Sequence, residues 1–241
     1  MLEFSVKGRL ALFTDPITGL GGEKYSYHIP TYEALRGITQ NIYWKPTFNW
    51  IIDKVRVMKP IRTFNKGIKT LSYYTGKHDL SYYTYLREVE YQVVAHIEWN
   101  MLRTDLVADR QPGKHHAIAC RSLDKGGRKN IVLGVTECPG DVEPCKFGEG
   151  QGAYDNIDEM GYGLMFHGFD YPELTGKTDI NGNPDINGEE RLFARFWRPV
   201  MKNGVIEFKR PDEIKDKKFI RLMKSVNPAT CGVDGDIEVE K

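Results

Sequence analysis

The sequence predicts an α+β fold, with a larger N-terminal domain over residues 1–134 and a smaller antiparallel β domain over residues 135–241. Before Gly134, runs with strand-like alternation and runs with helical spacing follow one another in the order βαββαβ. After Gly134, the chain becomes glycine-rich and acidic, and its apolar runs have the length of strands. A chain of 241 residues with 40% apolar composition can bury one large core or two smaller ones.

The first three elements are predicted from alternation and from capping signals. Residues 3–13 alternate as a strand, and the turn-forming residues that follow end it. Thr31 is a good N-cap for a helix whose apolar side chains recur at helical spacing as far as Ile42, before Pro46 forbids its continuation. Residues 48–58 form the next predicted strand, which is largely apolar.

Residues 60–83 form a long predicted connection that is rich in lysine, arginine and tyrosine, and Leu-Ser-Tyr-Tyr-Thr occurs twice, starting at Leu71 and at Leu80. Interleaved cations and aromatic rings can hold single-stranded nucleic acid, because the cations neutralise phosphates and the rings stack on bases. A β-hairpin whose tyrosines pack on the body of the protein accounts equally well for the pattern. The sequence favours neither interpretation.

The second half of the predicted N-terminal domain contains a strand over residues 87–99, a helix from Lys114 to the stop signal Gly126-Gly127, and a short strand over residues 130–133. The resulting order is that of the ferredoxin-like fold, which RNA-recognition domains share. We therefore expect two helices side by side and antiparallel on one face of a sheet.

This topology brings Tyr43, at the end of the first predicted helix, to the same edge as Lys114 and His115, at the start of the second. A helix N-terminus offers free N–H groups and a partial positive charge, so a phosphate docked there would meet Lys114 and a histidine together. At about 100° per residue, His116 falls on the stripe expected to face the sheet, whereas His115 falls at its margin and reaches solvent. An amphipathic helix that merely begins with polar residues is the alternative.

Residues 1–130 carry 20 of the 34 Lys and Arg but only 12 of the 33 Asp and Glu, a net charge of +8 against −7 for the remainder. This asymmetry indicates that the first half meets a polyanion, although two domains that attract each other would give the same pattern. The side chains that we expect to contact RNA are Lys45, Arg56, Lys59, Arg62, Lys66, Lys69, His116, Arg128 and Lys129.

Other signals argue against secretion, membrane insertion and bound metals. The N-terminus has no apolar signal segment, and no run approaches the length that spans a membrane. The four cysteines lack the paired spacing of a zinc site or a disulfide framework, so we expect free thiols and a cytoplasmic protein.

Two loops resemble ligand-binding segments only superficially. Residues 179–190 have oxygen side chains at alternate positions, as calcium loops do, but Pro184 stands where the sharp turn needs glycine. The glycines of residues 19–24 complete no phosphate-binding pattern. A plain surface turn is favoured for both, and we expect neither a metal nor a cofactor.

Five blocks of the sequence together are specific, although each alone would be weak. They are Leu10-Ala11-Leu12-Phe13-Thr14-Asp15-Pro16, Pro30-Thr31-Tyr32-Glu33-Ala34-Leu35-Arg36-Gly37-Ile38, Ile42-Tyr43-Trp44-Lys45-Pro46-Thr47, Arg56-Val57-Met58-Lys59-Pro60-Ile61 and Arg195-Phe196-Trp197-Arg198-Pro199-Val200-Met201. They closely resemble the type I-C CRISPR-associated protein of the fifth Cas family, its d or c variant. The similarity covers nearly the whole chain except the C-terminal tail.

The resemblance implies a sequence-specific endoribonuclease that cuts CRISPR repeat precursor RNA without metal. It further implies that the protein stays on the 5′ handle of the product, as a subunit of the type I-C surveillance complex. The family's active residues carry over to Tyr43, Lys114 and His115. The glycine-rich loop of related processing enzymes survives here only as Gly126-Gly127-Arg128-Lys129, so the resemblance does not assign its part in gripping RNA.

Cutting RNA without metal uses the 2′-hydroxyl as the nucleophile, and it needs a base, an acid at the leaving 5′-oxygen and a cation near phosphorus. Lys114 suits the cation, and the sequence leaves open whether His115 or Tyr43 is the base. Two alternatives remain: a non-catalytic scaffold that caps the crRNA 5′ handle, and a generic RNA-recognition domain with Phe4 and Tyr91 on its sheet face. Whether the free protein also binds duplex DNA is likewise open.

Overall fold

The computed structural model describes residues 1–15, 23–71, 76, 78–171, 173–178, 184–187 and 191–222, with the backbone alone for 173–178 and 184–187. The elements of these residues are β1 (Leu2–Ala11), β2 (Lys24–Tyr25), α1 (Tyr32–Ile42), β3 (Phe48–Val57), β4 (Thr63–Leu71), β5 (His78–Trp99), η2 (Thr104–Asp109), α2 (Pro112–Leu123), β6 (Ile131–Val132), β7 (Pro139–Pro144), β8 (Met160–Gly161), β9 (Met165–Asp170), β10 (Glu173–Thr178), β11 (Pro184–Asn187), β12 (Arg191–Trp197), β13 (Val200–Lys202), β14 (Val205–Glu207), η3 (Pro211–Glu213) and β15 (Lys217–Leu222).

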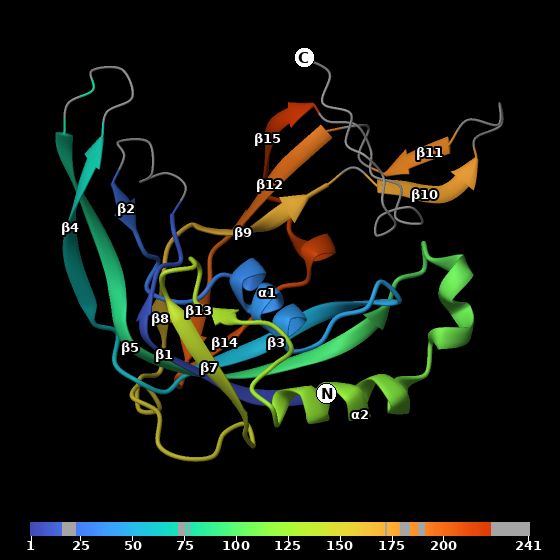
Figure 1. Cartoon of the computed structure of the whole chain (residues 1–241), viewed down its shortest axis with the longest axis horizontal. Coiled ribbons are helices and arrows are strands. Elements are labelled where there is room, and N and C mark those ends of the chain that lie inside the picture. Colours follow the sequence, from blue (N-terminus) through green and yellow to red (C-terminus); the bar gives the residue numbers. More distant parts are fainter. Residues whose placement is uncertain are drawn as a thin grey trace.

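Ten strands of the described chain form one sheet in the order β6-β7-β1-β5-β3-β14-β13-β8, and β2 and β4 pair with β5. The long strand β5 is antiparallel to β1, β3 and β4. A second sheet has the order β15-β12-β9. In Figure 1, α1 lies between this second sheet and α2.

The predicted α+β class is confirmed, and β1, α1, β3, β5, α2 and β6 follow one another in the predicted order. Thr31 caps α1 as predicted, because its hydroxyl accepts from the Ala34 N–H at 3.2 Å. The second helix begins at Pro112, two residues before the predicted start, since the first helical turn accommodates proline. It ends before Gly126 and Gly127, whose φ angles of 78° and 99° fit the predicted stop.

The connection over residues 60–83 is, in its described part, the β-hairpin of the second interpretation. Strand β4 pairs with the first part of β5 from Thr63↔Leu86 to Leu71↔His78, and the hairpin projects as an arm at the left of Figure 1. Tyr82 is 52% exposed on this arm, so its ring does not pack on the body of the protein as the second interpretation expected. Nucleic-acid binding by the arm therefore stays a prediction, and Tyr73, Tyr74 and Lys77 lie outside the described residues.

The sheet continues across the predicted domain boundary after residue 134. Strand β7 pairs with both β6 and β1, and β14 pairs with β3 at the other side of the sheet. Strands from both predicted domains are thus hydrogen-bonded in one sheet. The calcium-like segment over residues 179–190 lies outside the described side chains, and residues 223–241 are not described at all.

The prediction of two antiparallel helices lying side by side is wrong. The Asn41 carbonyl, near the end of α1, accepts from the N–H groups of Arg128 and Lys129, just beyond α2, at 2.9 and 3.0 Å. Two residues later, Tyr43 reaches His115 in the first turn of α2. The end of α1 thus contacts both the first turn of α2 and the segment that returns after α2, and Figure 1 shows α1 nearly along its axis while α2 lies across the view.

The sheet face that carries Phe4 and Tyr91 packs inside the core. Phe4 is fully buried and Tyr91 is 2% exposed. Aromatic rings that stack on RNA bases must be accessible, so the structure contradicts the interpretation as a generic RNA-recognition domain with these two rings on an open sheet.

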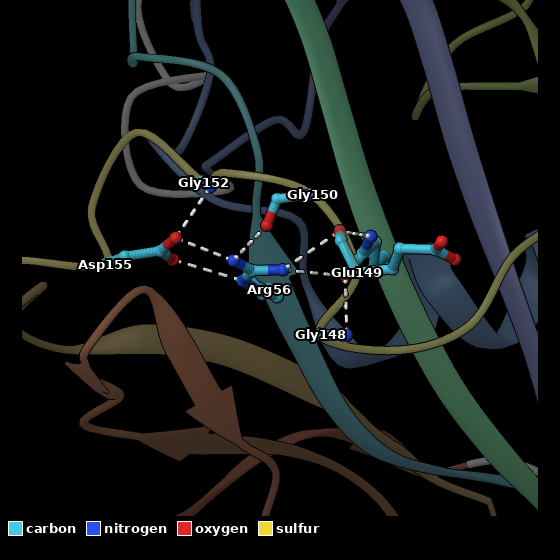
Figure 2. A network of polar contacts seen from close by, with 7 residues as sticks. Arg56, Gly148, Glu149, Gly150, Gly152 and Asp155 are labelled. Carbon is cyan, nitrogen blue, oxygen red and sulfur yellow. Dashed lines mark hydrogen bonds and ion pairs between the residues drawn. The ribbon is translucent and has the colours of Figure 1, made fainter.

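The opposite face of the sheet is covered by the loop over residues 145–155, which Arg56 holds in place. Arg56 alternates with Val55 and Val57 along β3, so its side chain projects from the opposite face of the sheet. Its guanidinium donates to Asp155 Oδ1 and Oδ2 at 3.1 and 2.6 Å and to the carbonyls of Glu149 and Gly150 at 3.3 and 3.0 Å, as Figure 2 shows.

The Gln92 amide completes this network by accepting from Arg56 Nη1 at 3.2 Å and donating to the Glu149 carbonyl at 2.7 Å. Arg56 is 6% exposed. The prediction that Arg56 contacts RNA is therefore wrong: its donors are engaged inside the protein, where no phosphate can reach them.

Replacing Arg56 tests its role in holding the loop over residues 145–155. We expect Arg56→Met to lower the free energy of unfolding by about 2 kcal/mol, because the charged hydrogen bonds to Asp155 and to two carbonyls are lost together. Arg87→Met is the matched control, since the Arg87 side chain forms only an exposed pair with Glu88 among the residues that the structure describes. Urea denaturation measures both, and equal losses in the two variants would contradict the role.

Candidate active site

Tyr43 is positioned by the end of α1. Its N–H bonds to the Thr39 carbonyl at 3.1 Å, but its φ of −160° and ψ of 132° turn the chain out of the helix. The Trp50 indole donates to the Tyr43 carbonyl at 2.6 Å. These two contacts fix the backbone of Tyr43, whose side chain points toward α2.

His115 lies in the first turn of α2 and is fully buried. Its Nδ1 lies 2.8 Å from the Tyr43 hydroxyl, and the two rings stack with centroids 5.9 Å apart. Phe48 and Trp99 present edges to the imidazole at 5.1 and 5.8 Å. The structure thus brings Tyr43 and His115 together, as the sequence predicts.

The predicted orientations of the two histidines are wrong. The buried stripe of α2 contains His115, Ala119 and Leu123, whereas His116 is exposed and its Nε2 lies 3.0 Å from the Met1 carbonyl. The predicted stripe began one residue too late. The reason is that Phe48 and Trp99, on neighbouring strands, cover the first turn of α2 and enclose His115.

The contacts of His115 determine where its proton sits. Nε2 lies 2.7 Å from the Asp109 carbonyl, which can only accept, so Nε2 carries the hydrogen. Nδ1 of the neutral ring then accepts from the Tyr43 hydroxyl. Tyr43, His115 and Asp109 therefore form a hydrogen-bonded chain in which the phenol can pass a proton to the imidazole.

Asp109 connects this chain to Lys114. One carboxylate oxygen accepts from the Lys114 ammonium at 2.5 Å, and the other accepts from the Thr47 hydroxyl at 2.7 Å. These two hydrogen bonds lower the pKa of the Asp109 carboxyl to about 2, and the contact with Asp109 raises the pKa of Lys114. Lys114 remains at the surface, with 47% of its side chain exposed.

Sequence reasoning missed Asp109 and Thr47. Asp109 precedes α2 by only a few residues, so a carboxylate this close to Lys114-His115 was the signal that could have found it. Thr47 gives no such signal, because it is 62 residues from Asp109 in the chain.

Arg128 covers the other side of the tyrosine. The chain turns back after α2, and the Arg128 guanidinium lies over the Tyr43 ring at 4.6 Å from its centroid. Burial raises the pKa of the Tyr43 phenol, and the charge of Arg128 opposes that shift. Arg128 and Lys129 are both exposed, and the Arg128 guanidinium adjoins the buried pair.

The remaining predicted RNA contacts are dispersed. Lys45 is exposed two residues after Tyr43, Lys59 pairs with Glu90 at 3.4 Å, and Arg62 is exposed at the base of the arm. Lys66 and Lys69 are exposed on β4, within the arm. The structure therefore joins Arg128 and Lys129 to the site at the end of α1 and places the lysines of β4 on a different part of the molecule.

The described residues contain neither a metal-binding cluster nor a helix that could span a membrane. No group of three or more His, Cys, Asp or Glu side chains among them is arranged to hold a metal ion. None of the helices in the described ranges has the length and apolar character needed to cross a membrane.

The model of the CRISPR-associated protein family Cas5d matches residues 1–209. The chain belongs to the Cas5d family. It is 27% identical over 235 residues, covering 86% of this chain and 93% of the relative, to a Mannheimia succiniciproducens protein named CRISPR pre-crRNA endoribonuclease Cas5d. The resemblance inferred from the five sequence blocks is confirmed.

Two solved structures share the fold. A crystal structure of a CRISPR-associated protein has 34% sequence identity and a TM-score of 0.72, with 90% of this chain and 95% of that chain covered. A Streptococcus mutans protein described as functionally uncharacterized has 36% identity and a TM-score of 0.71, with 90% and 96% covered. The α+β architecture of this chain is therefore that of solved relatives over most of its length.

The ionised state of Asp109 gives a pH prediction. Its folded-state pKa of about 2 lies below the ordinary 3.8, so the carboxylate stabilises the fold above about pH 4 and that stabilisation is lost as the pH falls through about 2. We expect Asp109→Asn to be less stable than the unmodified chain at pH 5 and the difference to shrink toward pH 2. Denaturant titrations at stepped pH measure it, and a difference independent of pH would contradict the assignment.

Proposed function

We propose that this chain is an endoribonuclease that cuts CRISPR repeat precursor RNA and keeps the 5′ handle, as a subunit of a type I-C surveillance complex. The observation that carries the proposal is the Tyr43–His115 hydrogen bond with Lys114 and Arg128 beside it. Membership of the Cas5d family and the name of the Mannheimia succiniciproducens relative support it.

The proposed reaction breaks the RNA backbone with its own sugar oxygen. The 2′-oxygen attacks phosphorus, and its proton goes to the Tyr43 oxygen while the phenolic proton passes to His115 Nδ1. The bond from phosphorus to the 5′-oxygen breaks, and the same relay returns one proton to that oxygen. The products are a 2′,3′-cyclic phosphate and a 5′-hydroxyl, and no step requires a metal ion.

The residues around the relay have complementary roles in this proposal. Burial raises the pKa of Tyr43, so at neutral pH the phenol is protonated and acts as a relay rather than as a free base. Lys114 and Arg128 stabilise the charge that grows on the phosphoryl oxygens. Asp109 holds both Lys114 and the Nε2–H of His115, which keeps Nδ1 free to receive the proton.

RNA must displace part of this arrangement before it reacts, because Tyr43 is 1% exposed. We propose that the Arg128 guanidinium covers Tyr43 and moves away when RNA binds. It lies over the Tyr43 ring, its residue is exposed, and a phosphate offers it a stronger partner than an aromatic ring does.

A non-catalytic scaffold that caps the 5′ handle is the second candidate. One observation favours it: His115 is buried, and both of its ring nitrogens are satisfied within the protein. A satisfied buried histidine can serve the fold alone. Cleavage by the intact protein separates the two candidates.

The decisive experiment incubates the purified chain with its own repeat hairpin RNA in EDTA. We expect a single cut, and we expect Tyr43→Phe and Lys114→Ala each to slow it by about 100-fold or more, because each removes a group that acts in the transition state. Tyr43→Phe keeps the packed ring, so loss of activity is separated from loss of folding.

Lys125→Ala is the control, because Lys125 is exposed at the far end of α2. Its rate should equal that of the unmodified chain. Tight RNA binding without any cutting would favour the scaffold, and undiminished cutting by Tyr43→Phe and Lys114→Ala would refute the assigned residues.

A further inference from the structure

A cavity of about 450 Å³ opens between α1, the end of β9, β12, η3 and β15. The cations that line it are Arg36, Arg191, Arg195 and Lys217. We call it the Arg195 pocket. Its volume lies in the range of small-ligand sites. The residues of the Tyr43–His115 relay and the cations beside them do not line it.

Arg195 is the buried centre of this pocket, with 3% of its surface exposed. Its Nη1 donates to the Phe169 carbonyl at 3.0 Å and pairs with Asp170, and its Nη2 lies 3.5 Å from Glu33. Its Nε is buried and has no hydrogen-bond partner among the described residues. A buried donor of a charged group without an acceptor is costly, and the other two nitrogens of Arg195 are already engaged by Phe169, Asp170 and Glu33.

The charges around Arg195 also leave an excess of cations. Asp170 is shared between Arg195 and Lys217, whose ammonium lies 2.7 Å away. Glu33 is likewise shared between Arg195 and Arg36, at 3.5 and 3.0 Å. Among the described residues, these two carboxylates link three cations, and Arg191 and Asp212 also line the cavity, so four cations and three carboxylates surround it.

Aromatic rings adjoin these cations. Tyr171 is 49% exposed and Phe169 is 38% exposed, with their ring centroids 6.0 Å apart, and Phe193 also lines the cavity. Exposed rings beside cations match the two parts of a nucleotide, because the rings stack on a base while the cations bind its phosphate.

The pocket lies along the same helix as the relay. Arg36 precedes Tyr43 by seven residues, about 10 Å along a helix axis. A stacked strand carries one phosphate per about 3.4 Å, so about three nucleotides cover that distance. The pocket also joins two of the five sequence blocks, because Glu33 and Arg36 from the block over residues 30–38 lie near Arg195 from the block over residues 195–201. The cleavage site uses neither block.

We propose that the Arg195 pocket binds one nucleotide of single-stranded RNA, with its phosphate on Arg36 and Lys217, which Glu33 and Asp170 link to the buried Arg195, and its base on Tyr171 and Phe169. The inference rests on the proposed function, because the RNA is the strand that is cut at Tyr43. The pocket anchors that strand a few nucleotides from the cut. Because stacking tolerates every base, it contributes affinity rather than sequence choice.

The test measures binding of the repeat RNA in a Tyr43→Phe background, where cleavage does not interfere. Tyr171→Ala should weaken binding about tenfold, because stacking on one ring is lost, whereas Tyr171→Phe should bind within about twofold of the background. RNA substituted with 4-thiouridine should crosslink to the peptide that contains Tyr171.

Lys217→Gln tests the phosphate contact, and Lys7→Gln is its matched control. Each lysine is a partly exposed partner in one ion pair, Lys217 with Asp170 at 2.7 Å and Lys7 with Glu143 at 2.6 Å. Lys217→Gln should lower the slope of log affinity against log salt by about 0.7, and Lys7→Gln should leave it unchanged.

The outcomes separate the pocket from the cleavage reaction. Cutting by the unmodified chain, with binding unaltered by Tyr171→Ala and Lys217→Gln, overturns the pocket alone. Loss of binding in both variants, with no cutting by the unmodified chain, supports the pocket and overturns the reaction. Saturation of the pocket by free nucleoside monophosphate, without any RNA crosslink to it, also overturns the assignment to RNA.

Discussion

The buried imidazole of His115 imposes the constraint on which the candidate site depends. Because the ring is excluded from water by Phe48 and Trp99, both of its nitrogens need partners inside the protein. Tyr43 satisfies one nitrogen and the Asp109 carbonyl satisfies the other. The Asp109 carboxylate then anchors Lys114. One desolvated ring thereby orders a phenol, a carboxylate and an ammonium from separate segments of the chain.

The two faces of the large sheet have different roles. On one face, Arg56 ties the loop over residues 145–155 to the strands and closes that surface. On the other, α1 links the relay at its C-terminal end to the Arg195 pocket near its N-terminal half. The proposed RNA path therefore follows the helix, whereas RNA-recognition domains use the open face of their sheet.

Local signals were sufficient for local structure. The Thr31 cap and the stop at Gly126-Gly127 each follow from neighbouring residues and were predicted. The exposure of His115 and His116 was predicted wrongly, because it depends on residues from other segments of the chain. A helical wheel gives the spacing of a buried stripe, but the packing partners decide which residue begins it.

The order of β1, α1, β3, β5, α2 and β6, the family resemblance, and the residue types that can move a proton or bind a phosphate all follow from the sequence. The tertiary structure alone decided which of them meet. Tyr43 and His115 are 72 residues apart, Arg56 and Asp155 are 99 apart, and Glu33 and Arg195 are 162 apart. No periodicity within one element encodes such pairs, because they form only when folding buries polar groups that must then find partners wherever the chain supplies them.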